Sequence, residues 1–344
     1  MSIASETIKR IARDCGFELA GIAPVAPPED FARFEAWAAQ GHAGEMRYLT
    51  DRRGEIRRDV RHLLPAARSV ICVGKLYNQQ GSPVPPGHAV ISRYAWGRDY
   101  HEILRAGLEK MAANLQQIAD FEWKICVDTA PLLERTFARL AGLGWIGKNT
   151  CLINEPLGSW FFLGELITSL DLTPDSPPPD RCGTCTRCID ACPTGAFVPA
   201  ADSWAIDSRR CIAYLNIELR GPVPEQFRAA MGPHVFGCDI CQEVCPWNSR
   251  APLTDSFEDL HRAPALEDCA RLTEREFQEA FRHTALARPK YTGFLRNVAI
   301  AMGNSGLEKF REPLKTLALN PDPMVVAHAR WALGQIAHLP FRND

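Results

Sequence analysis

Residues 181–193, RCGTCTRCIDACP, decide the organisation of this chain, because their four cysteines follow the spacing C-x2-C-x2-C-x3-C-P. In bacterial ferredoxins the first three cysteines of such a run bind one 4Fe–4S cluster, and the cysteine before proline binds a second cluster. Residues 238–246, CDICQEVCP, repeat the pattern with one cysteine fewer. Cys211 lies between the two runs and can supply the missing thiolate. The sequence therefore predicts two 4Fe–4S clusters.

The same crossing pattern divides the eight cysteines into two ligand sets, because each cluster needs four thiolates. The first cluster is expected to bind the first three cysteines of the first run and the last cysteine of the second run. The second cluster takes the other four. The predicted sets are Cys182, Cys185, Cys188 and Cys245 for one cluster, and Cys192, Cys211, Cys238 and Cys241 for the other.

Disulfides and zinc are the alternative uses of these cysteines. A disulfide scaffold is typical of small secreted chains, whereas this chain has 344 residues and begins with an amphipathic pattern that lacks the apolar core of a secretion signal. Zinc favours widely separated C-x2-C pairs over two runs that each close with Cys-Pro. Buried reduced thiols are expected for the remaining five cysteines, Cys15, Cys72, Cys126, Cys151 and Cys269.

Composition indicates a chain with a sizeable core and no membrane segment. It is 46% hydrophobic and 23% charged, and its length allows two or three domains. The most apolar stretch, residues 160–170, is too short for a bilayer and contains Glu165. Heptads and long apolar edges are absent from the sequence. We therefore expect a cytoplasmic monomer.

Local charge permits a polyanionic partner, although the net charge is only −2. Residues 47–68 contain seven arginines, and residues 271–344 contain eleven lysines and arginines against seven acidic residues. Solvated helix faces explain such runs equally well. The charge pattern therefore allows nucleic-acid binding without requiring it.

The chain divides into three segments, which predict an α+β fold. Residues 1–175 mix helical stretches with β-rich runs, and residues 69–73 and 123–127 are predicted to be interior strands. The proline-rich residues 173–180 are predicted to form a linker, which leads into a ferredoxin-like two-cluster domain at 176–250. The first segment is then an α/β domain, and residues 251–344 form a helical domain.

Two helices are predicted within that last segment, at residues 289–303 and 321–337, because apolar residues recur there at helical spacing after a proline. The second helix resembles one unit of a HEAT repeat, a class of repeat that often presents a concave binding surface. A plain helical bundle remains open.

Residues 142–149, GLGWIGKN, match the dinucleotide pattern G-x-G-x-x-G and nearly match the phosphate loop, which needs Ser or Thr at Asn149. Both motifs follow a strand. Residues 131–141 instead read as a helix that opens with Pro131 and ends before Gly142. We therefore interpret the glycine segment as a tight turn.

Asp128 is the acidic residue that stands out, because it ends a predicted strand and precedes a predicted helix. Sheets of α/β proteins place catalytic groups at such junctions. A buried carboxyl beside a cofactor can stay protonated and act as a general acid. Helix capping by Asp128 or Thr129 is the structural alternative. The residues alone leave both open.

Over nearly its whole length the chain resembles the epoxyqueuosine reductases, cobalamin- and iron–sulfur-dependent enzymes that complete queuosine in tRNA. Four segments carry this resemblance beyond the cysteine spacing, namely VDTAP at 127–131, GKN at 147–149 with LIN at 152–154, GSWFFL at 158–163 and CDICQEVCPWN at 238–248.

The resemblance implies a reaction and its parts. Electrons from an external donor pass singly through the two clusters to cobalamin, which as Co(I) removes the epoxide oxygen at the tRNA wobble position. Asp128 matches the proposed proton donor of the family. The residues implied to contact cobalamin are Arg57, Asp128, Leu152, Asn154, Leu163, Ala213 and Ile240.

The resemblance also implies that no histidine binds the cobalt. The string nearest to the cobalt-binding motif D-x-H-x-x-G is residues 99–104, DYHEIL, which has Leu104 in place of glycine. His101 is therefore predicted not to bind cobalt.

The implied partner is a tRNA carrying epoxyqueuosine in its anticodon loop, where the base is already unstacked and can enter a pocket. The arginine-rich segment and the basic tail would contact phosphates.

Two other functions are compatible with the cysteine pattern. Cobalamin-dependent reductive dehalogenases share the cofactors, but they usually carry a twin-arginine leader and lack the helical tail. A cobalamin-free electron carrier would use the clusters alone, and the tail would then bind a partner enzyme.

Overall fold

The structure is a computed structural model that describes the chain except residues 1–2, 82, 202, 256, 258–259 and 339–344. Its centre is a four-stranded antiparallel sheet in the order β1-β2-β7-β4. The strands are β1 (Leu19–Pro24), β2 (Ser69–Leu76), β4 (Trp123–Cys126) and β7 (Phe161–Thr168). Among the described residues, no helix has the length and apolar character needed to cross a bilayer.

The two strands predicted from the sequence both form, but only one of them is interior. Strand β2 includes residues 69–73 and lies between β1 and β7. Strand β4 lies at the edge of the sheet, so the prediction of an interior position was wrong there. Trp123 is 37% exposed, and Lys124 is exposed beside it. A lysine on an edge strand discourages that strand from pairing with another chain. The edge position therefore accounts for the exposed Lys124 in the β-rich run of β4.

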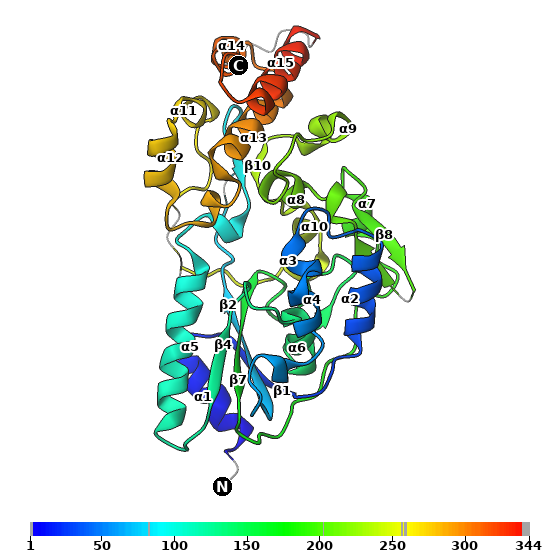
Figure 1. Cartoon of the computed structure of the whole chain (residues 1–344), viewed down its shortest axis with the longest axis vertical. Helices are drawn as coiled ribbons and strands as arrows, with labels where there is room; N and C mark the ends of the chain where they lie inside the picture. The colour runs from blue at the N-terminus through cyan, green and yellow to red at the C-terminus, as the bar shows by residue number, and fades with distance from the viewer. Residues whose placement is uncertain (1–2, 82, 202, 256, 258–259, 339–344) are drawn as a thin grey trace.

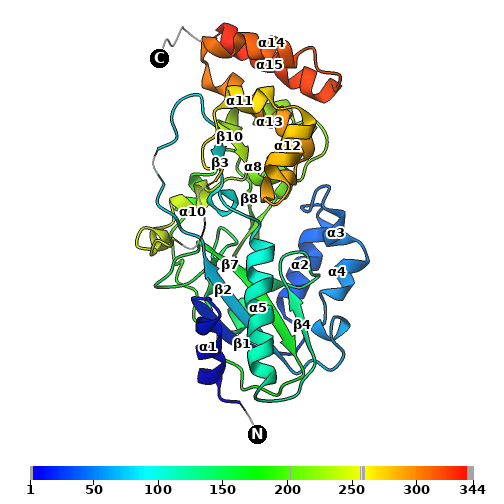
Figure 2. The same cartoon turned by 90° about the vertical axis from the view of Figure 1, so that its left-hand side faces the viewer.

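Helices cover both faces of the sheet (Figure 1, Figure 2). Helices α1 (Ser5–Asp14) and α5 (Tyr100–Gln116) pack on one face, and α6 (Glu134–Leu140) packs on the other. Apolar side chains of α5 recur about one turn apart and face the sheet, as expected for an amphipathic helix. They are Leu104, Leu108, Met111 and Leu115.

Three short helices lie beside α6 in Figure 1: α2 (Asp30–Ala39), α3 (Arg47–Thr50) and α4 (Arg52–Ile56). A salt bridge of 3.0 Å between Arg139 and Asp30 joins α6 to α2. Most of the arginine-rich segment seen in the sequence therefore lies on one side of the sheet.

The proline-rich residues 173–180 contain no helix or strand, yet they are firmly attached to the first segment. Asp175 forms a salt bridge of 2.7 Å with Lys9 and accepts the backbone N–H of Ile22 at 3.0 Å. Beyond this linker, the cysteine region is built from short elements. They are α7 (Arg187–Asp190), β8 (Phe197–Ala200), β9 (Ser203–Ile206), α8 (Ile212–Ile217), α9 (Glu225–Arg228), β10 (His234–Phe236) and α10 (Ile240–Glu243).

The tail is helical, as predicted, with helices α11 (Leu266–Arg271), α12 (Glu274–Phe281), α13 (Lys290–Ser305), α14 (Arg311–Leu317) and α15 (Pro323–His338). The last two predicted helices correspond to α13 and α15. Helices α13 and α15 approach closely at Gly303, where an added Cβ would lie only 2.7 Å from the Cβ of Ala332. A glycine there permits that close packing.

The tail and the cysteine region share a core that also takes in a piece of the first segment. Strand β3 (Val90–Ile91) pairs with β10, and Trp96 belongs to the same apolar cluster as Phe294 of α13. Arg296 of α13 is fully buried, and its guanidinium donates to backbone carbonyl groups of the cysteine region. Those carbonyls belong to Leu215 (2.7 Å), Leu219 (2.9 Å) and Gly221 (2.6 Å). Each segment is therefore continuous in sequence, but the segments pack against one another and share a core.

Candidate functional site

The structure brings the seven cysteines of the two runs and Cys211 together in two groups. Burial, together with three neighbouring thiols, raises the pKa of Cys188 to about 11, and those neighbours are Cys245, Cys182 and Cys185. In the second group, burial and the nearby thiols of Cys211 and Cys192 raise the pKa of Cys238 to about 12. Cys241 in turn neighbours Cys238 and Cys211. The thirteen cysteines all lie among the described residues, and none of them forms a disulfide.

Backbone N–H groups point at several of these sulfurs. The amide of Ala196 donates to the sulfur of Cys192 at 3.3 Å, and the amides of Ala213 and Ile240 donate to neighbouring sulfurs of the second group. Such hydrogen bonds to cysteine sulfurs set the potential of an iron–sulfur cluster. The donor set and its surroundings therefore fit two 4Fe–4S clusters.

The glycine segment is a hairpin turn, as predicted, and it contacts both cysteine runs. Strands β5 (Trp145–Ile146) and β6 (Leu152–Ile153) pair around it. The ammonium of Lys148 donates to the carbonyl groups of Gly183 (2.6 Å) and Cys185 (3.0 Å), and the Asn149 amide donates to that of Cys241 (3.4 Å). Sequence reasoning missed this role. The GKN string was its signal, because two polar side chains in a tight turn need acceptors.

Cys151 is a ninth cysteine at this site. Its thiol lies against that of Cys241 at the end of the hairpin turn. The sequence suggested only a scattered buried thiol at this position, because nothing in the spacing connects Cys151 with the two runs.

Asp128 lies in a loop that joins β4 to α6. Its backbone φ is +51°, in the left-handed region that residues other than glycine seldom adopt, at a cost on the order of 1 kcal/mol or more. Its backbone N–H donates to the carboxylate of Glu134 at the start of α6. Surrounding contacts must hold such a backbone, and Glu134 provides one.

Two sequence interpretations of this loop were wrong. Helix α6 begins at Glu134 and not at Pro131, because residues 128–133 are used by the loop. Its N-cap residue is Leu133, without a side-chain cap, so neither Asp128 nor Thr129 caps it. The hydroxyl of Thr129 instead donates to the carbonyl of Val127 at 3.3 Å.

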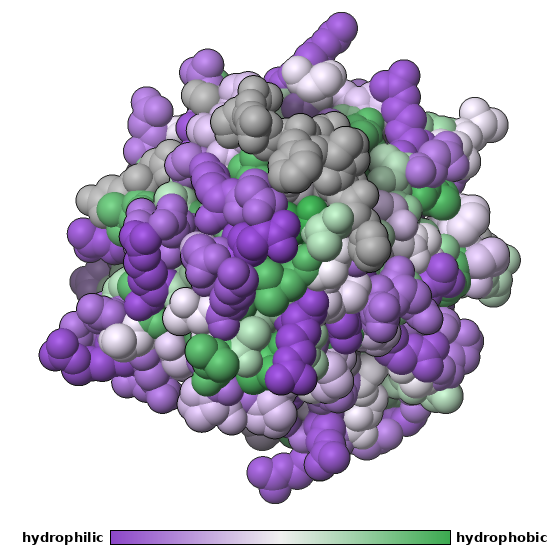
Figure 3. Space-filling view, turned by 90° about the horizontal axis from the view of Figure 1, so that it is seen from above, coloured by the Kyte–Doolittle hydropathy of each residue, from purple (hydrophilic) through white to green (hydrophobic). Residues whose placement is uncertain are grey.

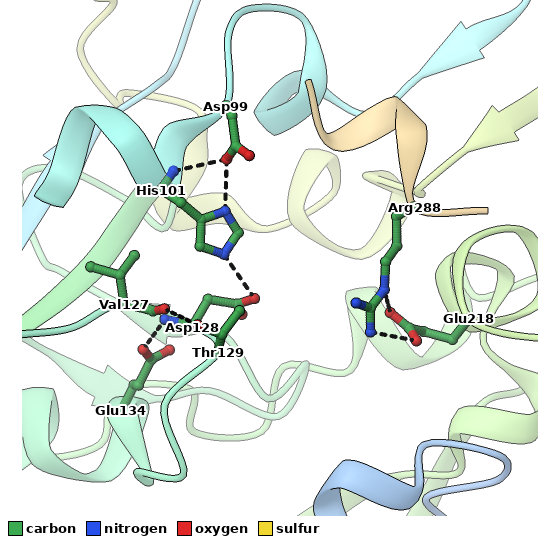
Figure 4. A network of polar contacts seen from close by, with 8 residues as sticks. All are labelled: Asp99, His101, Val127, Asp128, Thr129, Glu134, Glu218 and Arg288. Atoms are coloured by element: carbon green, nitrogen blue, oxygen red, sulfur yellow. Dashed lines mark hydrogen bonds and ion pairs between the residues drawn. The ribbon is translucent and has the colours of Figure 1, made fainter. Parts of the chain in front are cut away.

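The side chain of Asp128 faces a histidine held between two carboxylates (Figure 4). His101 Nε2 lies 3.3 Å from Asp128 Oδ2, and His101 Nδ1 lies 2.7 Å from Asp99 Oδ1. Asp99 also caps α5 through the backbone N–H of His101, at 2.9 Å. Both ring nitrogens of His101 are therefore engaged by carboxylates, an arrangement consistent with the prediction that His101 does not bind cobalt.

These contacts decide where a proton lies. Burial lowers the pKa of His101, but the hydrogen bonds to Asp128 and Asp99 outweigh it and raise the pKa to about 9. Partial burial raises the pKa of Asp128, while the bond from His101 lowers it, and the balance falls below the ordinary value. At neutral pH the imidazole therefore holds the proton and Asp128 is ionised. The Asp128 side chain is 57% exposed and can meet a ligand directly.

The helical tail contributes the opposite wall of this site. Arg288, which follows α12, forms a bidentate pair with Glu218 at 3.0 and 3.1 Å, and its guanidinium lies 5.6 Å from the centre of the Tyr48 ring. Figure 4 shows this pair across from Asp128. The backbone N–H of Asp99 donates to the carbonyl of His283 at 2.8 Å, which joins the tail to the His101 cluster. The tail is therefore part of the site.

Two of the residues implied to contact cobalamin lie close to the Asp128 loop or anchor the hairpin. Arg57 is buried, donates to the carbonyls of Arg53 (2.8 Å) and Tyr48 (3.2 Å), and interacts electrostatically with Glu134 beneath the loop. Asn154 donates to the carbonyl of Leu143 at 2.7 Å.

The other implied residues are apolar. Leu152 and Leu163 pack in the cluster between the sheet and α6. Ala213 and Ile240 adjoin the second cysteine group. The chemistry of this set, a guanidinium with apolar side chains, suits a large ring with amide groups at its rim.

Comparison with known proteins gives a consistent result. Residues 57–129 match the family described as "Epoxyqueuosine reductase QueG, DUF1730", and residues 181–248 match the "4Fe-4S double cluster binding domain". The chain is 40% identical over 346 residues to the epoxyqueuosine reductase of Xanthomonas campestris pv. campestris, and the match covers 96% of each chain.

Two solved structures share the fold. A crystal structure of epoxyqueuosine reductase with an epoxyqueuosine-modified tRNA-Tyr stem loop has a TM-score of 0.89 and 29% identity, covering 96% of this chain and 89% of that one. The enzyme of Bacillus subtilis gives a TM-score of 0.87 and 28% identity, with 96% and 90% covered. In that structure a catalytic loop named for its aspartate is swung out of the active site.

Proposed function

The chain belongs to the epoxyqueuosine reductase family, and from that premise we propose that Asp128 is the proton donor of the reaction. The protein is an oxidoreductase that reduces epoxyqueuosine in tRNA to queuosine, with cobalamin and two 4Fe–4S clusters as its cofactors. The family assignment favours this function over the dehalogenase and electron-carrier alternatives.

The reaction needs protons as well as electrons. Converting an epoxide to an alkene takes up two electrons and two protons and releases the oxygen as water. The observation that supports Asp128 is its direct contact with His101, which holds a proton at neutral pH. When ligands cover the site and exclude water, the pKa of the Asp128 carboxyl rises, and the proton passes from the imidazole to the carboxylate. Asp128 then donates it to the epoxide oxygen.

The loop that carries Asp128 is proposed to move. Its left-handed backbone at Asp128 is strained, and a strained residue is held only by its surroundings. The swung-out loop of the Bacillus subtilis relative supports a second, outward position for the Asp128 loop.

The cofactor contacts are proposed from the family and the local geometry together. Cobalamin, when bound, supplies the cobalt chemistry that removes the oxygen. We assign its contacts to Arg57, Leu152, Asn154, Leu163, Ala213 and Ile240, and the cluster ligands to the two cysteine groups. The second group adjoins Ala213 and Ile240, which favours it as the group nearer cobalamin. An external donor supplies the electrons.

The RNA is proposed to bind along the tail and the arginine-rich helices. Hydrophilic side chains project from most of the tail end in Figure 3, with separate apolar patches between them. A cavity of about 330 Å³ lies between α12 and α13, lined by basic and aromatic residues that suit a phosphate and a base. They are Arg282, Lys290, Phe277 and Tyr291, and the remaining lining residues are Glu274, Gln278 and Ala287. We also propose a HEAT-like arrangement of the tail, and a monomeric protein that acts in the cytoplasm.

The test of the proton donor is an anaerobic turnover assay. Reconstituted holoenzyme, with a strong reductant, would be incubated with tRNA carrying epoxyqueuosine, and the digested nucleosides analysed by mass. Asp128→Asn is expected to lower the rate by about 100-fold or more, since positioned general acids contribute on that scale. Asp120→Asn, at an exposed carboxylate eight positions earlier, is the matched control and should convert at the wild-type rate. An Asp128→Asn enzyme as fast as this control would overturn the assignment.

A further inference from the structure

The indole of Trp145, in the β5–β6 hairpin, packs against the first cysteine group. It shares a small apolar cluster with Trp247, Cys182 and Cys245, and these two cysteines are predicted ligands of the same 4Fe–4S cluster. The rings of Trp145 and Trp247 meet edge to face, with their centres 5.0 Å apart and their planes at 79°. This ring contact and the pairing of β5 with β6 hold the indole beside the ligand sulfurs.

The indole N–H of Trp145 is a buried donor without an ordinary acceptor. Trp145 is only 2% exposed, and its ring nitrogen makes no hydrogen bond of standard geometry among the described residues. A buried donor that stays unpaired is costly. The indole N–H faces the sulfur of Cys182, because burial raises the pKa of that thiol while the backbone N–H of Lys148 and the indole N–H lower it. A thiolate that binds a cluster accepts an N–H better than a thiol does, so this donor fits a cluster at the site.

Lys148 brings a positive charge to the same cysteine group. Its ammonium donates to the carbonyl groups of Gly183 (2.6 Å) and Cys185 (3.0 Å). Within the part of the chain that the structure describes, it forms no ion pair with a carboxylate. The opposite charge comes from Asp180, an exposed residue that accepts the backbone N–H of Cys182 at 2.7 Å. The ammonium of Lys148 therefore acts on the cluster site and not on a partner side chain.

We propose that Trp145 and Lys148 raise the reduction potential of the first cluster, Trp145 by donating its N–H to the Cys182 sulfur and Lys148 by its charge. Reduction adds one electron, and hence one negative charge, to a cluster, so nearby donors and cations favour the reduced form. The two residues contact the ligands and their loop and not the substrate, so they are tuning residues and not catalytic ones. The inference rests on the proposed cluster ligands and is independent of the proton donor.

The direct test is a redox titration of the reconstituted protein without tRNA, followed by electron paramagnetic resonance. The signal that is missing from Cys188→Ala identifies the first cluster. Trp145→Phe keeps an aromatic ring and removes the N–H. It is expected to shift the one-electron equilibrium of this cluster about 10-fold towards the oxidised form, which is a fall in potential of about 59 mV. Trp123→Phe, on the edge strand β4, is the matched control and should leave both potentials unchanged.

Charge variants test Lys148 separately. Lys148→Gln keeps an N–H donor for the loop carbonyls but removes the charge, so the same equilibrium should shift several-fold towards the oxidised form. Lys148→Arg keeps the charge and should retain the wild-type potential. Asp180→Asn removes a negative charge and should shift the equilibrium in the opposite direction. Iron analysis of each variant ensures that the potentials are compared at full cluster content.

An unchanged potential of the first cluster in both Trp145→Phe and Lys148→Gln, at full iron content, would overturn the inference. A shift in only one of them would overturn the role of the other residue. Equal shifts of both clusters would also contradict the inference, because they would indicate a general loosening of the hairpin. Failure of the proposed ligand assignment gives a different result: Cys188→Ala would then keep its full iron content, and the inference would fall with that assignment.

Discussion

The cysteine region and the Asp128 site reach their geometry in opposite ways. The cysteine runs place most of their sulfurs through local spacing, because single helical turns, α7 and α10, lie within each run. The Asp128 site gathers residues from α5, a loop, α6 and the tail, so no sequence window contains it. The comparison teaches that the cysteine positions are encoded mainly by local spacing, whereas the contacts around Asp128, the proposed proton donor, depend on the tertiary fold. A substitution in the cysteine region should therefore impair cluster binding without disturbing the Asp128 site, and a substitution at the Asp128 site should leave the clusters intact.

The largest effect is expected from removing a cysteine of the first group. Cys188→Ala deletes one of four predicted thiolates, so the protein should lose about half of its bound iron and nearly all turnover with a physiological donor. Iron analysis and absorbance of the reconstituted protein would check this. Cys269→Ala, at a buried thiol in the tail core, is the control and should keep full iron content. Equal iron in both variants would contradict the ligand assignment.

A smaller, pH-dependent effect is expected at His101. Its pKa is raised from 6.5 to about 9, so the stabilisation from Asp99 and Asp128 is fully present below pH 6.5 and is lost as pH rises through 9. The melting temperature of wild type should exceed that of His101→Gln at pH 6, and the gap should close by pH 9.5. His62→Gln, at an exposed histidine, should show no such trend. A gap that widens with pH would refute the ion-pair arrangement.

The smallest effect is expected from single charges on the proposed RNA-binding surface. Lys290 lines the tail cavity, and Lys290→Glu should weaken tRNA binding several-fold. It should also reduce the salt dependence of binding, because each phosphate contact contributes about one unit to the slope of the logarithm of the binding constant against the logarithm of the salt concentration. Charge reversal at Arg52 or Arg53 should act in the same direction, and less at Arg53, which pairs with Asp51 at 2.6 Å. Lys124→Glu on the edge strand is the control. Salt-insensitive binding would rule out the phosphate contacts.

The sequence predicted the parts that depend on local pattern. Cysteine spacing indicated both thiol groups, and helical periodicity indicated α13 and α15. The β-branched run at 69–73 gave β2. At 123–127 the same reasoning failed in part, because residue type alone does not tell an edge strand from an interior one.

The rest of the site depends on contacts across the chain. Glu165 stood out in the sequence only as a charge within the most apolar stretch, and only the fold places it in the sheet opposite Cys72 and Cys126. Nothing in the sequence pattern indicated that Glu134 accepts the backbone N–H of Asp128. Lys148 belonged to a misleading glycine motif, yet its ammonium supports the first cysteine run. Asp128 itself was identified at a strand end, but its left-handed backbone followed from packing that no propensity encodes.

One measurement tests the separation of the two regions most directly. Holoenzyme variants with bound cobalamin, verified by absorbance, would be reduced chemically in the absence of a physiological donor and mixed with one equivalent of epoxyqueuosine tRNA. We expect Cys188→Ala to convert close to one substrate per enzyme, because its electrons are already loaded, and Asp128→Asn to convert almost none. Conversion by Asp128→Asn at the rate of Cys188→Ala would contradict the assignment of proton delivery to the Asp128 loop.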